Sequence, residues 1–170
     1  MKRHNFIVLG VSGSGKSSIA KNLSLHSNFE YIDADKFHSI KNKMKMKAGK
    51  ELTEEDRIPW LKKISKFLKR KKKNWVLACS ALKNHHRIIL LDGVENTTLI
   101  WLDSTFKNIT ERINKRKNHF FSSKLIQSQF DTFEAPKVCL RIKTNRPLHI
   151  VKFDVRSLTR RRLKSLNLLS

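Results

Sequence analysis

The segment Gly10–Ser17 carries the clearest chemical signal in the chain. Its sequence, Gly-Val-Ser-Gly-Ser-Gly-Lys-Ser, matches the pattern GxxxxGK[ST] at every fixed position and holds three of the chain's five glycines. Glycines let a loop wrap closely around phosphate oxygens with its backbone N–H groups turned inward, and a helix that begins at the loop adds its dipole. The segment therefore predicts a binding loop for a nucleotide polyphosphate.

Two side chains of this loop have an expected task on ATP and magnesium. Lys16 is expected to reach the β- and γ-phosphates, which also makes it a candidate catalytic residue, and Ser17 is expected to place its hydroxyl on Mg²⁺. The candidate nucleotide-binding residues form one continuous stretch: Gly10, Val11, Ser12, Gly13, Ser14, Gly15, Lys16, Ser17 and Ser18.

Two carboxylates, Asp33 and Asp35, follow the apolar run that ends at Ile32. Ligands bind at the carboxyl ends of strands in open α/β sheets, so both side chains are expected near the nucleotide. Asp33 is a candidate for holding Mg²⁺ through water, and Asp35 for accepting the proton of an attacking hydroxyl. The plainer alternative is a solvated strand end that caps a helix.

Two pairs of cations have the i, i+4 spacing that places both members on one face of a helix. Lys83 and Arg87 form a pair that can grip a carboxylate or a phosphate. Arg112 and Arg116 form a pair suited to a lid, because the spread negative charge of a transferring phosphoryl group needs several donors. Ordinary solvated helix charge is the alternative for both pairs.

The apolar pattern predicts the elements that position these residues. Short apolar runs typical of buried strands occur at 6–9, 29–33, 75–79 and 98–102, with a fifth expected at 138–143 or 150–153. Helical spacing occurs at 17–25, at 59–72 and near the C-terminus. Strands that alternate with helices predict an α/β fold in three layers, with a parallel sheet covered by helices on both faces.

Pro59 affects one of these helices. Proline lacks a backbone N–H and is unfavourable inside a helix. The acidic turn at 53–57 is therefore expected to be separate from the helix at 59–72.

Length and composition limit the class of protein. A chain of 170 residues with 39% hydrophobic residues predicts one packed domain over residues 1–170. No apolar run has the roughly 18 residues that a membrane span needs, and no signal-peptide pattern is present, so a cytoplasmic protein is expected. The two cysteines have neither metal-ligand nor redox spacing. The net charge of +23 fits a nucleic-acid binder, an enzyme with anionic substrates, or compositional drift.

Taken together, the motifs resemble those of the gluconokinases, a family of the P-loop kinase superfamily, from Phe6 to about Pro136. Besides the phosphate loop, they are Asp33-Ala34-Asp35-Lys36-Phe37-His38, Asp56-Arg57-Ile58-Pro59-Trp60-Leu61, Cys79-Ser80-Ala81-Leu82-Lys83, and Ser128-Gln129-Phe130 with Glu134-Ala135-Pro136. The phosphate loop is generic, whereas the last three motifs in this order are highly specific. Shikimate kinases share the loop and the paired aspartates but carry three glycines where Cys79-Ser80-Ala81 stands here.

The resemblance implies a P-loop NTPase fold like that of the nucleoside monophosphate kinases, with a substrate-binding insert at about 36–60 and a lid at about 112–130. It implies ATP-dependent phosphorylation of D-gluconate, a magnesium cofactor and usually a homodimer. Asp35 is then the expected catalytic base, with Arg112 and Arg116 as lid residues. The residues expected to bind the substrate are Asp35, His38, Arg57, Lys83, Arg87, His119 and Gln129.

Two other functions remain open at this point. The charge favours a nucleic-acid-associated P-loop kinase, although the basic residues are dispersed and no RNA-binding signature is present, so only non-specific nucleic-acid binding is expected. A decayed gluconokinase with weak activity is the other, because the resemblance fades after Pro136. The family's usual glycine is also replaced by Ala34, and a common tyrosine by His86.

Overall fold

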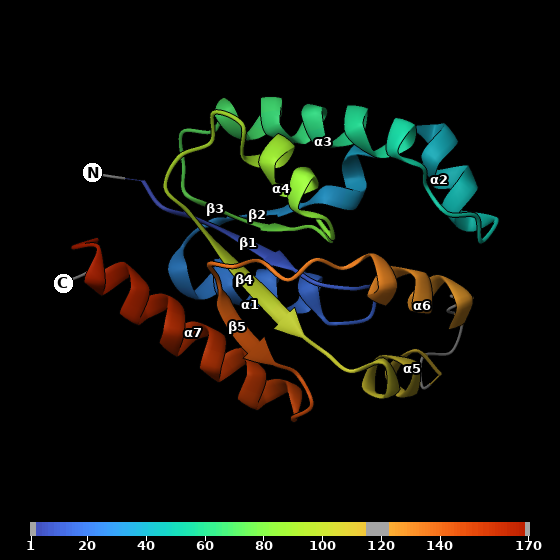
Figure 1. Ribbon diagram of the computed structural model, residues 1–170. Helices are drawn as coiled ribbons and strands as arrows, with labels where there is room; N and C mark the ends of the chain where they lie inside the picture. Colours follow the sequence, from blue (N-terminus) through green and yellow to red (C-terminus); the bar gives the residue numbers. More distant parts are fainter. Residues whose placement is uncertain (1–2, 115–122, 169–170) are drawn as a thin grey trace.

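The computed structural model describes residues 3–114 and 123–168. In this part of the chain a parallel sheet lies at the centre, with strand order β2-β3-β1-β4-β5 (Figure 1). Its strands are β1 (Asn5–Leu9), β2 (Glu30–Asp33), β3 (Trp75–Ala78), β4 (Thr97–Asp103) and β5 (Leu140–Lys143). The four expected strands are confirmed, and the fifth lies in the first of its two predicted positions. The second position, 150–153, belongs to the last helix.

Helices cover both faces of the sheet, which confirms the predicted layers (Figure 1). Strand β1 explains why: Phe6 and Val8 enter one apolar cluster, and Ile7 and Leu9 enter the other. The first cluster includes side chains of α1 (Lys16–Ser27) and α7 (Leu148–Ser165), and the second those of α3 (Glu54–Lys69) and α4 (Asn84–Leu91). A strand that is buried on both faces needs apolar residues at successive positions, as the run 6–9 has.

The separate acidic turn predicted at 53–57 is wrong, because α3 begins at Glu54 and continues through Pro59. Thr53 and Asp56 form a capping box that fixes the start of the helix. Pro59 is exposed near this end, where it removes a single intrahelical hydrogen bond, while Leu61 and Ile64 are fully buried against the sheet. Burial of this apolar face outweighs the local cost of the proline.

Four shorter elements lie between the strands: a 3-10 turn (Ala34–Phe37), α2 (Ile40–Lys47), α5 (Phe106–Asn114) and α6 (Ser123–Thr132). The turn and α2 belong to the expected insert at 36–60. Helices α5 and α6 overlap the expected lid at 112–130. Val11 of the phosphate loop packs in an apolar cluster with Ile109 and Ile113 of α5 and Ile126 of α6. These helices are therefore packed against the loop, while their role as a lid stays a prediction.

No helix within residues 3–114 and 123–168 is both long enough and apolar enough to cross a bilayer.

Candidate active site

The phosphate loop connects β1 to α1, and its backbone requires glycine at two crowded positions. Gly10 has a φ of 141°, and a Cβ there would lie 2.9 Å from the carbonyl oxygen of Leu102. Gly13 has a φ of 80°, and a Cβ there would lie 3.1 Å from the side chain of Ile109. Residues with a side chain rarely adopt such positive φ values, and a Cβ at either position would crowd its neighbours. Both the backbone conformation and the available space therefore require glycine here.

Lys16 and Ser14 are prepared for a ligand inside this loop. The Lys16 Nζ donates to the carbonyl of Val11 at 3.0 Å, and burial lowers its pKa, an effect that the charge of Asp35 partly offsets. The Ser14 hydroxyl is buried and has no hydrogen-bond partner among the described residues. Buried polar atoms are normally paired, so an unpaired donor in a glycine cradle at the start of a helix fits a polyphosphate.

Ser17 and Asp33 are the candidate magnesium residues, and Asp33 is already engaged. Its carboxylate accepts a hydrogen bond from the Tyr31 hydroxyl at 3.0 Å and one from the backbone N–H of Asp35 at 3.1 Å. The pKa of Tyr31 is raised to about 12, by burial first and by Asp33 next, so its hydroxyl stays a donor. The capping role was the plainer alternative for Asp33. The remaining lone pairs on its oxygens still fit a metal-bound water.

A cavity of about 170 Å³ lies beside the phosphate loop and collects the candidate substrate residues. Its lining includes Asp35, His38, Arg57 and Gln129, which the sequence analysis had singled out. Asp35 and His38 come from the 3-10 turn and the residue that caps it, Arg57 from α3 and Gln129 from α6, so three separate chain segments converge here. The cavity thus combines a carboxylate, an imidazole, a guanidinium and an amide, a set that suits a polar, negatively charged ligand.

His38 is held in this cavity by Trp60. The two rings stack with centroids 4.2 Å apart and an angle of 13° between their planes, and the Trp60 Nε1 donates to the carbonyl of Ala34 at 2.9 Å. The His38 Nε2 lies 3.9 Å from the Asp35 carboxylate. Its Nδ1 is buried without a partner among the described residues, and burial lowers the pKa of the ring. A neutral imidazole with an unpaired nitrogen is ready to bind a hydroxyl.

Gln129 connects α6 to the phosphate loop. Its Oε1 accepts a hydrogen bond from the backbone N–H of Ser12 at 2.7 Å, and its Nε2 donates to the Ser12 hydroxyl at 3.1 Å. In the described structure Gln129 therefore positions the loop at the wall of the cavity. This contact between residues far apart in the sequence had no local signal.

Lys83 and Arg87 do not line the cavity. The Lys83 Nζ forms an ion pair with Glu54 at 2.8 Å. Arg87 is buried, and its Nη1 donates to the carbonyls of Ala81 at 2.9 Å and Leu82 at 3.0 Å. The shared helix face that their spacing predicted is therefore wrong, because Lys83 precedes α4 as its N-cap, and only Arg87 supports the loop after β3. Two other cations, Arg57 and Lys50, line the cavity, and of these only Arg57 had been expected there.

Arg112, the lid candidate within the described residues, does not line the cavity. The Arg112 guanidinium donates to the backbone carbonyl of Thr144, which follows β5, and to its side chain at 3.5 Å. Arg116 and His119 fall outside the described residues. Their expected roles therefore stay predictions.

Several residues line the cavity without having been predicted to bind substrate, among them Trp60, Ser80, His86 and the charged pair Lys50 and Glu51. Trp60 had been named only as part of a family motif. Ser80 directly follows the third strand, where a ligand-facing residue is expected. His86 had been noted only as a departure from tyrosine.

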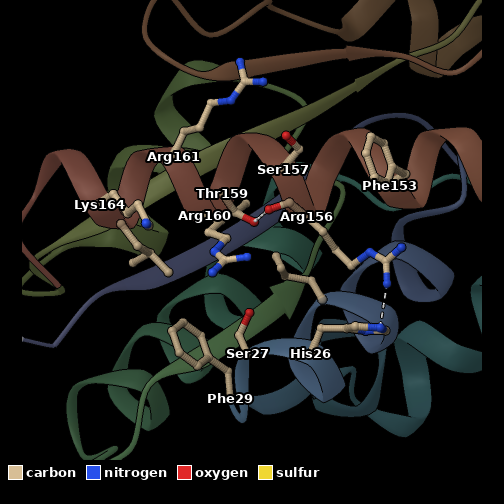
Figure 2. A pocket seen from close by; sticks show the side chains of 12 residues that line it. His26, Ser27, Phe29, Phe153, Arg156, Ser157, Thr159, Arg160, Arg161 and Lys164 are labelled. Carbon is tan, nitrogen blue, oxygen red and sulfur yellow. Dashed lines mark hydrogen bonds between the residues drawn. The ribbon is translucent and has the colours of Figure 1, made fainter. Parts of the chain in front are cut away.

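A second cavity, of about 740 Å³, lies between α1 and α7, and none of its lining residues belongs to the first cavity or to the phosphate loop (Figure 2). Arg156 reaches across it to His26, with 2.6 Å between Nη1 and Nε2. Arg160 and Lys164 lie on the same wall (Figure 2). Some of the basic residues that lie outside the predicted kinase site are therefore clustered around this cavity.

The parallel sheet, the phosphate loop between β1 and α1, and the cavity at the carboxyl ends of the strands define a P-loop kinase. The family model described as "Shikimate kinase" matches residues 12–160. Among characterised relatives, the thermoresistant gluconokinase of Escherichia coli K12 is 36% identical over 136 residues, covering 78% of both chains. The gluconokinase of Arabidopsis thaliana is 38% identical over 144 residues, covering 75% of this chain and 76% of the relative. The chain belongs to the gluconokinase family, as its motifs had indicated.

Solved structures agree with this assignment. A gluconokinase from Sinorhizobium meliloti 1021 superposes with a TM-score of 0.90 at 30% identity, covering 98% of each chain. A shikimate kinase from Aquifex aeolicus reaches a TM-score of 0.58 at 18% identity and shows the shared fold alone.

Proposed function

We propose that this protein transfers the γ-phosphoryl group of ATP to D-gluconate, forming 6-phospho-D-gluconate and ADP. The observation that carries the proposal is the convergence of Asp35, His38 and Arg57 on one cavity next to a complete phosphate loop. The sequence relatives named gluconokinase support the choice of substrate. Gluconate is a linear polyol with a terminal carboxylate, so it needs groups that bind hydroxyls and one cation.

Each group has a defined task in this reaction. Arg57 binds the gluconate carboxylate, and His38 holds a hydroxyl with its unpaired Nδ1. Asp35 accepts the proton of the 6-hydroxyl as its oxygen attacks the γ-phosphorus, and the bond between that phosphorus and the β–γ bridging oxygen breaks to release ADP. Lys16 stabilises the charge on the phosphates, and Arg112, Arg116, His119 and Gln129 complete the site from the lid side.

Magnesium would be held by Ser17 and, through water, by Asp33. When bound, the ion neutralises charge on the β- and γ-phosphates. Ser17 is an exposed residue at the start of α1, and Asp33 lies at the end of β2. Hard oxygen donors of this kind are those that Mg²⁺ prefers.

A coupled assay of ADP release tests the substrate. Purified protein is given ATP and Mg²⁺ with D-gluconate, with gluconate analogues that lack the carboxylate or the 6-hydroxyl, or with shikimate. Turnover is expected with gluconate, with weak or no turnover for the analogues and shikimate. Folded protein that binds ATP without gluconate-dependent turnover would contradict the proposal and support the decayed kinase.

The basic cavity between α1 and α7 supports a second proposal, that the protein binds nucleic acid weakly and without sequence specificity. Such binding should fall steeply with salt and be independent of sequence. RNA-stimulated ATP turnover in the absence of gluconate would instead support the nucleic-acid-associated kinase. We expect none, because the kinase cavity and the basic cavity share no lining residue.

The remaining parts of the proposal concern assembly and location. A homodimer is the state that the family resemblance implies, and light scattering after size-exclusion chromatography tests it. A cytoplasmic location is supported by the need for ATP, and cell fractionation tests it.

A further inference from the structure

Three side chains without an assigned task in phosphoryl transfer converge near the wall of the substrate cavity, which one of them, His86, also lines. The Oε2 of Glu54, at the start of α3, lies 3.0 Å from the Nε2 of His85 and 2.9 Å from the Nε2 of His86, both in the first turn of α4. The two imidazole rings lie 4.3 Å apart with 69° between their planes. One potential ligand atom from each residue lies within 4.8 Å of the other two.

The packing of α3 on α4 holds these groups in place. Leu61 and Ile64 of α3 share an apolar cluster with Leu90 of α4. At the other end of the pair the Ser65 hydroxyl donates to the carbonyl of Asp92 at 3.0 Å. The cluster therefore joins two elements whose relative position is already fixed, so a ligand would not have to order them.

We propose that Glu54, His85 and His86 form a binding site for a divalent transition metal ion of the zinc type. Bonds of about 2.0–2.1 Å in tetrahedral geometry place ligand atoms about 3.3 Å apart. The carboxylate oxygen lies within about 0.4 Å of that separation from both imidazole nitrogens. The potential ligand atoms of the two histidines lie within 4.8 Å of each other, so rotation of the more exposed His85 ring would bring all three to bonding distance of one ion. Three protein ligands leave a fourth position for water.

The donor set selects the class of metal. Imidazole nitrogen suits zinc, copper and nickel, whereas magnesium and calcium prefer oxygen ligands throughout. The site is therefore chemically distinct from the magnesium position at Ser17 and Asp33. Lys83 pairs with Oε1 of Glu54, which leaves Oε2 for the ion and fixes the orientation of the carboxylate.

The two histidines differ in exposure, so the site faces solvent on one side and the substrate cavity on the other. His85 is 47% exposed, so an ion can reach it from solvent. His86 is buried and lines the substrate cavity. The ion would thus lie between solvent and the cavity and would join α3 to α4 beside it.

The test uses untagged protein without nucleotide, and Zn²⁺ as the probe in competition with a chromogenic zinc indicator. Wild type is expected to bind one equivalent. His85→Gln and Glu54→Gln are expected to weaken binding by at least about tenfold, since even the loss of an outer-shell partner costs that much. His149→Gln, which removes an exposed histidine of α7, is the matched control and should bind like wild type. Unfolding midpoints in EDTA establish that each variant is folded.

Co²⁺ provides a second readout that identifies the ligand atoms. Wild type is expected to show the visible bands of tetrahedral cobalt without a thiolate charge-transfer band, and His85→Gln should lose them. The proposal is overturned if wild type takes up no zinc at micromolar concentration. It is equally overturned if His85→Gln and Glu54→Gln bind as tightly as wild type, or if a thiolate band assigns the metal to Cys79 or Cys139.

Discussion

Replacement of Trp60 by phenylalanine tests how the substrate cavity is held together. The indole makes two contacts that a phenyl ring cannot reproduce in full: its Nε1 donates to the buried carbonyl of Ala34 at 2.9 Å, and its face stacks on His38. A buried carbonyl without its donor costs about 1–3 kcal/mol. The lost apolar contact adds on the order of 1 kcal/mol. We therefore expect the free energy of unfolding to fall by about 2–4 kcal/mol.

The same substitution should disturb substrate binding, because Ala34 directly precedes Asp35 and the stack positions His38. If about 1.4 kcal/mol of binding energy is lost, the KM for gluconate rises about tenfold. The KM for ATP should stay within about twofold, since Trp60 does not belong to the phosphate loop.

Urea unfolding and steady-state kinetics measure both effects, with Trp101→Phe as the control. Trp101 contacts Phe133 and Arg141 and does not line the cavity, so its replacement should lower stability and leave the KM for gluconate unchanged. A Trp60→Phe protein that loses less than about 0.5 kcal/mol and binds gluconate normally would refute this account of the cavity.

Three further predictions concern the base, the loop contact and pH. Asp35→Asn should lower kcat by about 10²–10⁴ and leave ATP binding intact, as steady-state kinetics and calorimetry can show; normal turnover would rule out Asp35 as the base. Gln129→Ala removes two hydrogen bonds to Ser12 and should cost about 1–3 kcal/mol in urea unfolding, with a raised KM for ATP; unchanged values would contradict the positioning role. Burial, followed by the charge of Arg162, lowers the pKa of His4, so the unfolded chain takes up a proton that the folded ring resists, and stability falls as pH drops below about 6.5. His4→Gln should make the slope of stability between pH 5 and 7 shallower, by no more than about 1.4 kcal/mol per pH unit, and an unchanged slope would show that His4 does not contribute.

The sheet and the phosphate loop could be predicted because their signals are local. The run 6–9 is apolar at every position, as a strand buried on both faces requires, and the loop pattern fixes its own strand and helix. The error at Pro59 arose because the cost of a proline is local, whereas the burial that offsets it comes from tertiary contacts of Leu61 and Ile64.

The residues of the candidate site were predicted where a strand end or a family motif marks them, as motifs do for Arg57 and Gln129. Asp35 and His38 follow a strand end and do line the cavity. Arg87 was assigned from its spacing to Lys83, but a buried guanidinium needs acceptors, and the nearest are the carbonyls of its own loop. The bonds between Gln129 and Ser12 join residues 117 positions apart, a contact that no local pattern encodes.

The most direct test of the account is identification of the product. Wild-type protein incubated with ATP, Mg²⁺ and D-gluconate should form gluconate phosphorylated at the 6-hydroxyl and ADP in equal amounts, as followed by ³¹P NMR. Lys16→Ala should form neither. Release of ADP without a phosphorylated sugar acid, or no reaction from folded wild-type protein, would contradict the assignment of this site to gluconate phosphorylation.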